Sequence, residues 1–308
     1  MNKFAVITID TEPDCDTRWI RSNPLKFDSI SFGVKSILQP LFDKYNVKPV
    51  YFVSPEVIGD SKSLEILKVI SDDNRCEIGN HLHGEYVEPE KDFYKYDGTN
   101  SDKYICFDYD DNIEFEKIKN YDRQLTEAFN KKPTSFRAAR YGADTNTIRS
   151  LSKLGYTVDS SVTPNIDWSK QNGPNFRSFK DQPYLVDMQD FSKEDKGSKV
   201  LEIPITVGKK RFFFLPDKWF FYRWLRPTHM FVWEQKKMID DFIQKNKDRS
   251  DVVLCITFHS MEVIPKATPF VRTWFESKML VKRLEKTIRY LQEKGFSFKM
   301  LKEIKYQK

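Results

Sequence analysis

This chain has only four histidines, and three of them lie near the ends of strand-like runs, where an imidazole could take part in chemistry. His81 and His83 are separated by one residue, and His259 closes an apolar run at 252–258. Imidazoles placed just beyond buried strands can bind a metal or move a proton. Because side chains alternate along an extended segment, His81 and His83 would share one face and could bind the same ion. The pattern therefore favours an enzyme, and in particular a metal-dependent hydrolase.

Acidic side chains offer partners for these imidazoles. Asp10, Glu12 and Asp14 follow the first apolar run of the chain. Alternation would place Asp10 and Glu12 on one side, but a proline between Glu12 and Asp14 favours a turn, so either of these two could face inward as a metal ligand. Glu85, shortly after the histidine pair, competes for the same role.

Two arginines lie at or just beyond the end of a further strand candidate at 134–137. Guanidinium groups such as those of Arg137 and Arg140, placed at a strand end, can orient carboxylates or bind an anionic substrate. Gly142 would let a backbone N–H point into a cleft. The fourth histidine, His229, lacks a comparable neighbourhood, and we expect it to be structural.

Short apolar runs alternate with amphipathic stretches over most of the chain, and the two patterns indicate strands and helices respectively. We expect strands at 4–10, 48–54, 75–79, 134–137, 156–159, 200–206 and 252–258, and helices near 30–45, 61–72, 112–130, 144–154, 233–247 and 277–294. Gly155 and Gly295 each follow a helical stretch and are expected to end it. Such alternation predicts an α/β fold with a parallel sheet and helices outside it, open or closed into a barrel.

The composition limits domain count and partners. A chain of 308 residues is long enough for one large α/β domain or two ordinary ones. No shift in composition marks a boundary, so we expect one domain over 1–308 with loop excursions near 86–111 and 207–233. The 51 basic and 45 acidic residues, a net charge of +6, are mixed along the chain. Nucleic-acid binders concentrate their charge, so we expect no nucleic-acid partner.

The cysteines and the N-terminus bear on location. Four scattered cysteines without a Cys-x-x-Cys pair suit a reducing compartment. The N-terminus leads straight into a strand-like run without the longer apolar stretch of a signal peptide, and no stretch approaches the ~20 uncharged residues of a membrane span. We therefore expect a cytoplasmic protein.

An aromatic and basic stretch at 207–233 suggests a function of another class. Its rings and cations could rest on an anionic membrane surface or stack on sugar rings, which would make the protein a binding module with a peripheral membrane contact. The alternative is that these rings form core and hairpin contacts.

Taken together, the motifs resemble those of the polysaccharide deacetylase superfamily, also called the NodB-homology or carbohydrate esterase family four fold. The resemblance runs from about residue 4 to residue 304. It implies a distorted (β/α) barrel, usually with seven strands, that holds a divalent metal at its carboxyl-terminal face. The implied activity is removal of an acetyl group from an N-acetylated sugar, such as a lipid-linked or nucleotide-linked saccharide. A catalytically inactive relative that binds carbohydrate is the alternative.

The first two motifs concern the base and the metal. Residues 8–11 resemble the motif Thr-Phe-Asp-Asp, which implies that Asp10 is the base and that Thr11 replaces the metal-binding Asp. The second motif is commonly His-Ser/Thr-x-x-His, whereas this chain has a His-x-His form. The implied ligands are therefore His81, His83 and either Glu12 or Asp14. Zinc is the expected ion, with cobalt, manganese or nickel as alternatives.

The remaining motifs concern the transition state. Residues 136–142 resemble Arg-x-Pro-x-Gly with one residue extra. The resemblance implies that Arg140 or Arg137 holds the base ionised and that a backbone N–H near Tyr141 stabilises the oxyanion.

The segment 155–161, followed by Asp167 and Trp168, resembles the fourth motif, and the run that ends in His259 resembles the fifth. His259 is then the acid that protonates the leaving amine, and Asp159 is a candidate to orient it.

Overall fold

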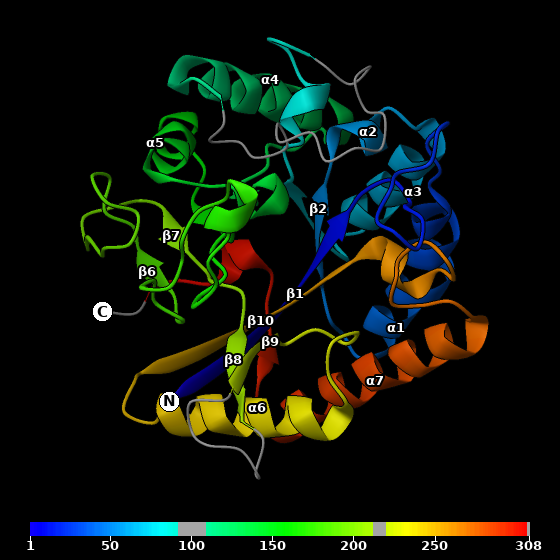
Figure 1. Ribbon diagram of the computed structural model, residues 1–308, viewed down its shortest axis with the longest axis vertical. Helices are drawn as coiled ribbons and strands as arrows, with labels where there is room; N and C mark the ends of the chain where they lie inside the picture. The colour runs from blue at the N-terminus through cyan, green and yellow to red at the C-terminus, as the bar shows by residue number, and fades with distance from the viewer. Residues whose placement is uncertain (92–108, 212–219, 307–308) are drawn as a thin grey trace.

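A curled sheet of parallel strands lies at the centre of the molecule (Figure 1). The computed structural model of the chain describes residues 1–91, 109–211 and 220–306. Within them the strand order is β10 (Asp251–His259), β1 (Asn2–Thr11), β2 (Val50–Val53), β3 (Glu77–Asn80), β4 (Ser135–Phe136), β5 (Val158–Asp159) and β7 (Leu201–Glu202). All of these neighbours pair in parallel. Antiparallel β6 (Tyr184–Leu185) lies beyond β7, and β11 (Ser297–Phe298) pairs with the start of β1.

The longest pairing joins the first strand of the chain to the last long one. β1 and β10 run in register from Asn2 beside Asp251 to Asp10 beside His259. Both strands are rich in Val, Ile and Thr and almost wholly buried, as expected of strands covered on both faces. This register brings a carboxylate and an imidazole 249 positions apart in sequence to adjacent points at the carboxyl edge of the sheet.

Hydrogen bonds made by two residues outside the strand ladder close the curled sheet between β7 and β10. Beyond β7, the N–H of Thr206 donates to the carbonyl of Cys255 (3.0 Å), and Thr206 Oγ1 accepts from the Cys255 N–H (2.8 Å). The side-chain amide of Gln182 donates to the Val253 carbonyl (3.1 Å) and accepts from its N–H (2.9 Å). The free edge of β10 thereby gains partners, and the sheet becomes a distorted seven-stranded barrel.

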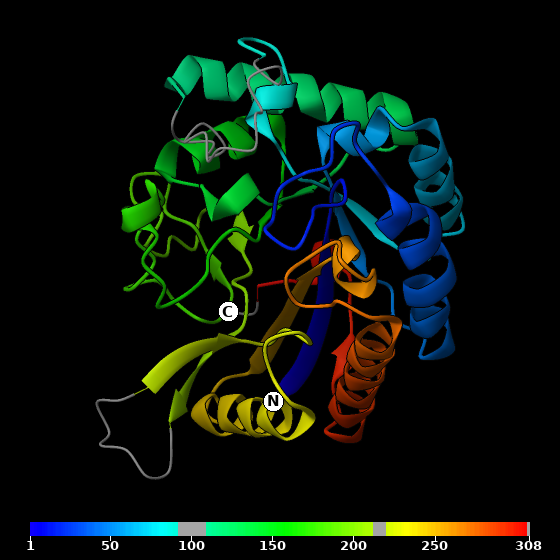
Figure 2. The ribbon, with the colours of Figure 1, turned by 45° about the vertical axis from the view of Figure 1, so that its right-hand side comes forward.

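Helices surround the sheet on its outside (Figures 1 and 2). They are the π-helical segment η1 (Ser29–Leu38), α1 (Gln39–Lys44), α2 (Pro55–Ile58), α3 (Ser61–Asp72), α4 (Asp111–Phe129), α5 (Thr145–Leu154), α6 (Val232–Lys245) and α7 (Trp274–Glu293). The sequence explains their ends. Asp144 caps α5 by accepting from the N–H groups of Asn146 and Thr147, and Gly155 ends it at φ 82°.

The predicted α/β architecture is confirmed. Each of the seven strands lies within or overlaps its predicted run, and the predicted stretch 30–45 is divided between η1 and α1. The expected excursion at 207–233 contains an antiparallel hairpin of β8 (Val207–Arg211) and β9 (Phe220–Trp224). Most of the excursion at 86–111 lies outside the described residues. No helix in the described ranges has the length and apolar character to cross a membrane.

Candidate active site

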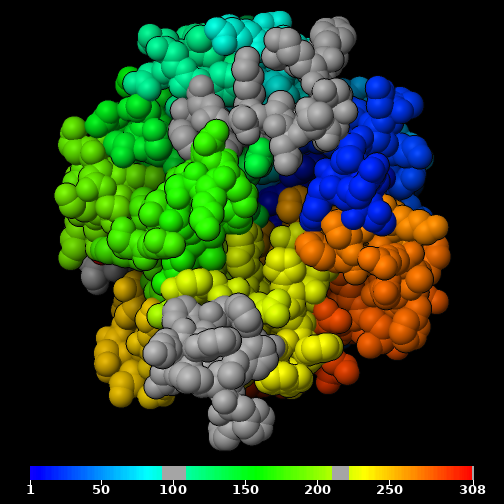
Figure 3. Space-filling model, viewed as in Figure 1, coloured from blue at the N-terminus to red at the C-terminus, as the bar shows by residue number. Residues whose placement is uncertain are grey.

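A cavity of about 340 Å³ opens where the central strands end. Figure 3 shows this face of the molecule hollowed between the blue N-terminal segment, the green segment and the orange segment that follows β10. The lining includes most of the side chains singled out in the sequence: Asp10, Glu12, His81, His83, Glu85, Arg140, Tyr141, Trp168 and His259. The carboxyl edge of a parallel sheet is the expected place for a site in such folds.

Two imidazoles and one carboxylate converge at the floor of this cavity. Nε2 of His81 lies 3.0 Å from Oε1 of Glu12, and Nε2 of His83 lies 3.7 Å from the same oxygen. One donor atom from each of the three residues falls within 4.8 Å of the others. Both histidines are buried. The spacing and the donor types are those of a divalent-metal site.

The other ring nitrogen of each histidine is fixed by a partner. Nδ1 of His81 donates to the backbone carbonyl of Arg137 (2.9 Å), and Nδ1 of His83 lies 2.8 Å from Oε1 of Glu56, a residue of α2. Arg21 Nη1 braces Glu56 (3.0 Å) and Glu85 (3.2 Å). A carboxylate or carbonyl behind a histidine sets its tautomer and turns the free nitrogen toward a metal.

The buried carboxylates of this cluster favour a positive charge beside them. Burial alone would lower the pKa of His83, but the carboxylate of Glu56, with Glu12, raises it to about 10. Burial would raise the pKa of Glu12, and His83 and His81 hold it well below its usual range. Glu56 Oε2 and Glu85 Oε2 are buried without a hydrogen-bond partner among the described residues. A divalent ion bound in place of the His83 proton would neutralise the same carboxylates, so the residues fit the metal that the fold family implies.

A buried ion pair holds the candidate base. Asp10 Oδ1 accepts from Nη1 of Arg137 at 2.7 Å, and both side chains are almost without solvent contact. The same guanidinium donates to Thr257 Oγ1 and to the carbonyl and hydroxyl oxygens of Ser160. Burial acts to raise the pKa of Asp10, but Arg137, with His81 and His259, lowers it below its ordinary value. Asp10 is therefore held ionised, as general-base chemistry requires.

His259 lies on the opposite side of the cluster with an acidic partner of its own. Its Nε2 is 3.6 Å from Glu12 Oε1 and 4.0 Å from Asp10 Oδ2. Its Nδ1 lies 3.3 Å from Oε1 of Glu262, a residue of the 3₁₀ turn η8 (Ser260–Val263) that also pairs with Arg226. Burial would lower the pKa of His259, but the hydrogen bond to Glu262 and the charge of Glu12 raise it. The protonated form of His259 is thus favoured more than in a free imidazole.

Asp14, the alternative metal ligand, lies away from the histidine pair. Its carboxylate accepts from the N–H groups of Asp28 (2.7 Å) and Ser29 (3.1 Å) at the start of η1. Burial raises its pKa to about 6. Of the acidic candidates Glu12, Asp14 and Glu85, only Glu12 joins the two histidines in the described structure. Strand β1 ends at Thr11, so the alternation along the extended segment does not continue to Asp14.

Asp159, the expected partner of His259, belongs to a different network. It accepts from Ser161 Oγ (2.7 Å) and lies beside Glu202, its register partner on β7, and burial raises the pKa of both carboxyls. The carboxylate that contacts the imidazole is Glu262. Glu262 follows His259 by three residues in a tight turn, so a local contact takes the place of the long-range contact with Asp159 that the sequence suggested.

The segment 136–142 also differs in detail from the expectation. Arg137, and not the exposed Arg140, pairs with Asp10. The N–H of Tyr141, expected to stabilise an oxyanion, donates to the carbonyl of Ala138 (3.1 Å), because Arg140 and Tyr141 adopt positive φ and close a turn. Both Arg140 and Tyr141 nevertheless line the cavity.

Aromatic rings form one wall of the cavity. Tyr141 stacks on Trp168 with centroids 6.0 Å apart and planes inclined by 22°. Trp224 packs against both rings. His229 packs between Trp224 and a phenylalanine of the loop after β10, and burial lowers its pKa to about 4. Its neutral, ring-packed state agrees with a structural role. Flat rings of this kind bind the apolar faces of sugars.

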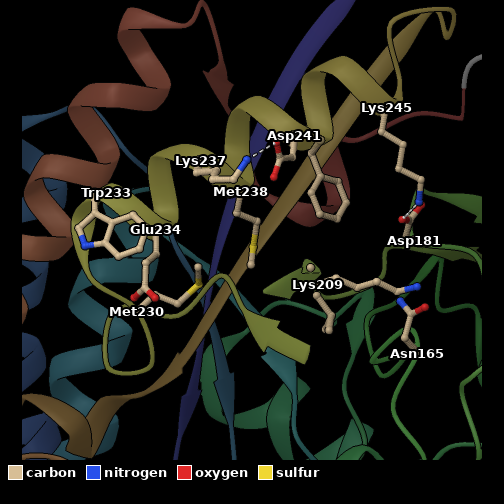
Figure 4. A pocket seen from close by; sticks show the side chains of 13 residues that line it. Asn165, Asp181, Lys209, Met230, Trp233, Glu234, Lys237, Met238, Asp241 and Lys245 are labelled. Atoms are coloured by element: carbon tan, nitrogen blue, oxygen red, sulfur yellow. Dashed lines mark hydrogen bonds and ion pairs between the residues drawn. The ribbon is translucent and has the colours of Figure 1, made fainter. Parts of the chain in front are cut away.

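A second cavity, of about 590 Å³, lies between α6 and the base of the β8–β9 hairpin (Figure 4). Its floor is apolar and contains Met230, Met238 and Phe242. The charged side chains at its rim pair with one another, Lys237 with Asp241 and Lys245 with Asp181. It contains no histidine and none of the candidate catalytic residues, so we assign no chemistry to it.

Comparison with known proteins gives matches of structure and none of sequence. No protein-family model and no curated protein matches the chain. A protein of Pseudomonas aeruginosa PAO1 described as a probable polysaccharide deacetylase is similar over 98% of this chain and 88% of its own, with TM-score 0.57 and 15% identity. A Mycobacterium smegmatis protein assigned to the polysaccharide deacetylases covers 99% and 95% (TM-score 0.51, 13% identity). PuuE allantoinase covers 97% and 87% (TM-score 0.55, 14% identity).

The chain therefore has the (β/α)-barrel fold of the polysaccharide deacetylases, as its motifs predict. Proteins named for other reactions share this fold, the allantoinase among them. A fold of this kind carries different chemistries, so the reaction has to be argued from the side chains at the carboxyl edge.

Proposed function

We propose that this protein is a metal-dependent hydrolase that removes the acetyl group from an N-acetylated sugar. The observation that carries the proposal is the meeting of three kinds of group at one point. Donor atoms of His81, His83 and Glu12 lie within 4.8 Å of one another, and Nε2 of His259 lies 3.6 Å from Glu12 and 4.0 Å from Asp10 in the same cavity. Metal site, base and acid are the three parts that hydrolysis of an amide needs.

His81, His83 and Glu12 would hold the ion, so that Glu12 supplies the carboxylate that Thr11 cannot. Thr11 is buried, and its hydroxyl donates to the carbonyl of Ile9. Imidazole and carboxylate donors suit zinc, and cobalt, manganese or nickel are compatible with the same set. When bound, a divalent metal supplies Lewis-acid polarisation of a carbonyl and makes water a stronger acid.

The residues around the cluster then share the proton transfers. Asp10, kept ionised by Arg137, accepts a proton from the attacking water. His259, kept protonated by Glu262, donates one to the departing amine nitrogen. Trp168 and Tyr141 would hold the sugar ring against the cavity wall. The general base thus lies on β1 and the general acid on β10, and the two residues are the last partners in the register of these strands.

The test is acetate release from soluble N-acetylated chito-oligosaccharides. Protein freed of metal with a chelator is reloaded with zinc, cobalt, manganese or nickel, and bound metal and product are measured together. Asp10→Asn is expected to lower turnover by roughly 10²–10⁴-fold, the usual contribution of a general base, while retaining the metal. Asp73→Asn, an exposed carboxylate directly after α3 that pairs with Arg75, is the matched control and should behave as wild type.

Two results would contradict the proposal. Undiminished turnover by Asp10→Asn would remove Asp10 from the chemistry. Metal-loaded protein that binds the oligosaccharide but never releases acetate would favour a noncatalytic carbohydrate-binding protein.

A further inference from the structure

Exposed apolar side chains gather on one face of the molecule. Ten large apolar residues are strongly exposed in the described part of the chain. Two of them, Met1 and Val69, lie apart from the rest. The other eight, which we call the aromatic rim, are Trp19, Phe32, Phe231, Trp233, Phe270, Trp274, Phe275 and Met279. Scattered exposed apolar residues are ordinary, but a gathered set marks a contact surface.

The topology places most of this rim at the carboxyl edge of the barrel, the same edge at which the candidate active site lies. η1, α6 and α7 each precede a strand that starts at the opposite, amino edge: β2, β10 and β11 respectively. Each helix therefore begins at the carboxyl edge and runs away from it. Most of the rim lies in the first turns of these three helices or just before them.

Ring contacts join the rim to the catalytic cavity. Trp19 lines that cavity and packs on the imidazole of His259 at 5.3 Å between centroids. Phe270 packs on Trp19 at 5.5 Å. Figure 3 shows the blue and orange segments that carry these residues side by side at the border of the hollow. A surface that touches the rim would therefore lie directly over the mouth of the site.

Neighbouring rings of the rim meet at steep angles and do not share one plane. Phe32 and Trp274 meet at 81°, and Trp19 and Phe270 meet at 76°. A polysaccharide strand stacks on rings that share a plane, which these pairs do not. Four of the eight residues are phenylalanines, which have no polar group for sugar hydroxyls. Exposed Trp and Phe side chains suit the boundary between lipid headgroups and acyl chains.

Basic residues accompany the rim. The exposed charged side chains on η1, the loop after β10 and the first half of α7 are mostly cations: Lys35, Lys266, Arg272, Lys278 and Lys282. One acid, Glu276, is exposed in the same part of α7, and its carboxylate accepts from the N–H groups at the helix start. Lysine and arginine beside protruding apolar residues are attracted to anionic lipid headgroups.

We propose that the aromatic rim docks this protein on an anionic lipid bilayer, so that the cavity receives an acetylated sugar carried on a membrane lipid. The membrane contact stands on the rim alone, whereas the nature of the substrate rests on the proposed deacetylase function. Docking through residues at the edge where the cavity opens would present the headgroup sugar to His259 and Asp10 without extracting the lipid.

Vesicle sedimentation tests the contact. We expect the protein to pellet with vesicles of phosphatidylcholine containing about 30% phosphatidylglycerol and much less with phosphatidylcholine alone. Trp274→Glu/Phe275→Glu is expected to weaken binding by roughly tenfold or more. These side chains are exposed by 51% and 72%, and acidic residues in a first helical turn are tolerated, so the variant should fold. Val69→Glu, an equally exposed apolar position on α3 (53%), is the matched control and should bind as wild type.

The outcomes separate the two proposals. Absence of binding to both vesicle types, or equal loss of binding in Val69→Glu, overturns the docking surface whatever the activity. Binding to insoluble chitin that the rim variant loses would instead assign the rim to a polysaccharide. If the rim variant loses vesicle binding but hydrolyses soluble chito-oligosaccharides at the wild-type rate, both proposals stand. Vesicle binding without hydrolysis of any acetylated sugar would sustain the docking surface and refute the deacetylase.

Discussion

Arg137 Nη1 donates to Asp10 Oδ1 at 2.7 Å, and the two side chains are exposed by no more than 2%. A buried ion pair of this kind persists only when its remaining donors and acceptors are satisfied. Arg137 meets that condition through Ser160 and Thr257. The pair thus links strands β1, β4 and β10 beneath the cavity, and it fixes both the position and the charge of the candidate base.

Removal of the guanidinium should damage both stability and chemistry. Arg137→Met leaves Asp10 buried without its counter-ion, which typically costs about 3–5 kcal/mol of unfolding free energy. Urea denaturation measures this change. Arg140→Met, three residues along and exposed, should stay close to wild type. A loss in Arg137→Met no larger than that of Arg140→Met would show that the pair contributes little.

Glu56 should control metal affinity through His83. Its carboxylate lies 2.8 Å from Nδ1 of that histidine, and loss of such an outer partner usually costs about 10–100-fold in metal affinity. We expect Glu56→Gln to bind zinc that much more weakly in competition with a chromogenic chelator. Glu65→Gln, exposed on α3, serves as control. Unchanged affinity in Glu56→Gln would place the metal elsewhere.

Glu262 should set the alkaline limit of activity. The hydrogen bond that the imidazole donates to this carboxylate raises the pKa of His259, and a general acid stops working as the pH rises through its pKa. In Glu262→Gln that pKa should fall, so the alkaline limb of the kcat/KM profile should move to lower pH. Asp159→Asn should leave the limb in place, because Asp159 bonds to Ser161 and not to the imidazole. The reverse result would restore Asp159 as the orienting residue.

A buried carboxyl away from the site should make stability depend on pH. Burial raises the pKa of Glu114 from an ordinary 4.5 to about 7, although Thr147 donates a hydrogen bond to it. The folded state therefore favours the protonated form, and this stabilisation is complete below pH 4.5 and lost as the pH rises to about 7.

Glu114→Gln removes that dependence. Between pH 4.5 and 7, wild type should lose about 3 kcal/mol of unfolding free energy relative to the variant, as measured by urea titration at several pH values. Glu116→Gln, exposed on the same helix, should follow wild type throughout. Parallel curves for wild type and Glu114→Gln would mean that Glu114 is ionised in the folded state.

The sequence predicts the barrel because its strands are buried on both faces. Runs such as 4–10 and 252–258 are continuous stretches of Val, Ile and Phe, which parallel sheets require. Strands β6 and β11 were not predicted, because each has two residues at an edge of the sheet and its sequence therefore shows no periodic pattern. Helix α2 escaped because four residues that begin with proline resemble a turn.

The site was less predictable than the fold. Asp10 lies near the end of β1, and His81 and His83 follow β3 closely, so their neighbourhood follows from topology. Glu56 and Arg21 reach the site from α2 and from an irregular loop, and nothing in their local sequence marks them. Glu262 could have been found, because an acid three residues after His259 satisfies the capping pattern of a helical turn.

Hydrogen bonds outside the strand ladder close the barrel between β7 and β10. Between β7 and β10, four hydrogen bonds from Gln182 and Thr206 do the work of a strand ladder. Breaking them would part the ring at one point while every pairing between strands stays intact. Asp10 and His259 would then move as one body, since β1 and β10 share a long register, away from the wall that Trp168 and Tyr141 form. Gln182 and Thr206 therefore help to hold the two sides of the cavity together, although neither residue lines it.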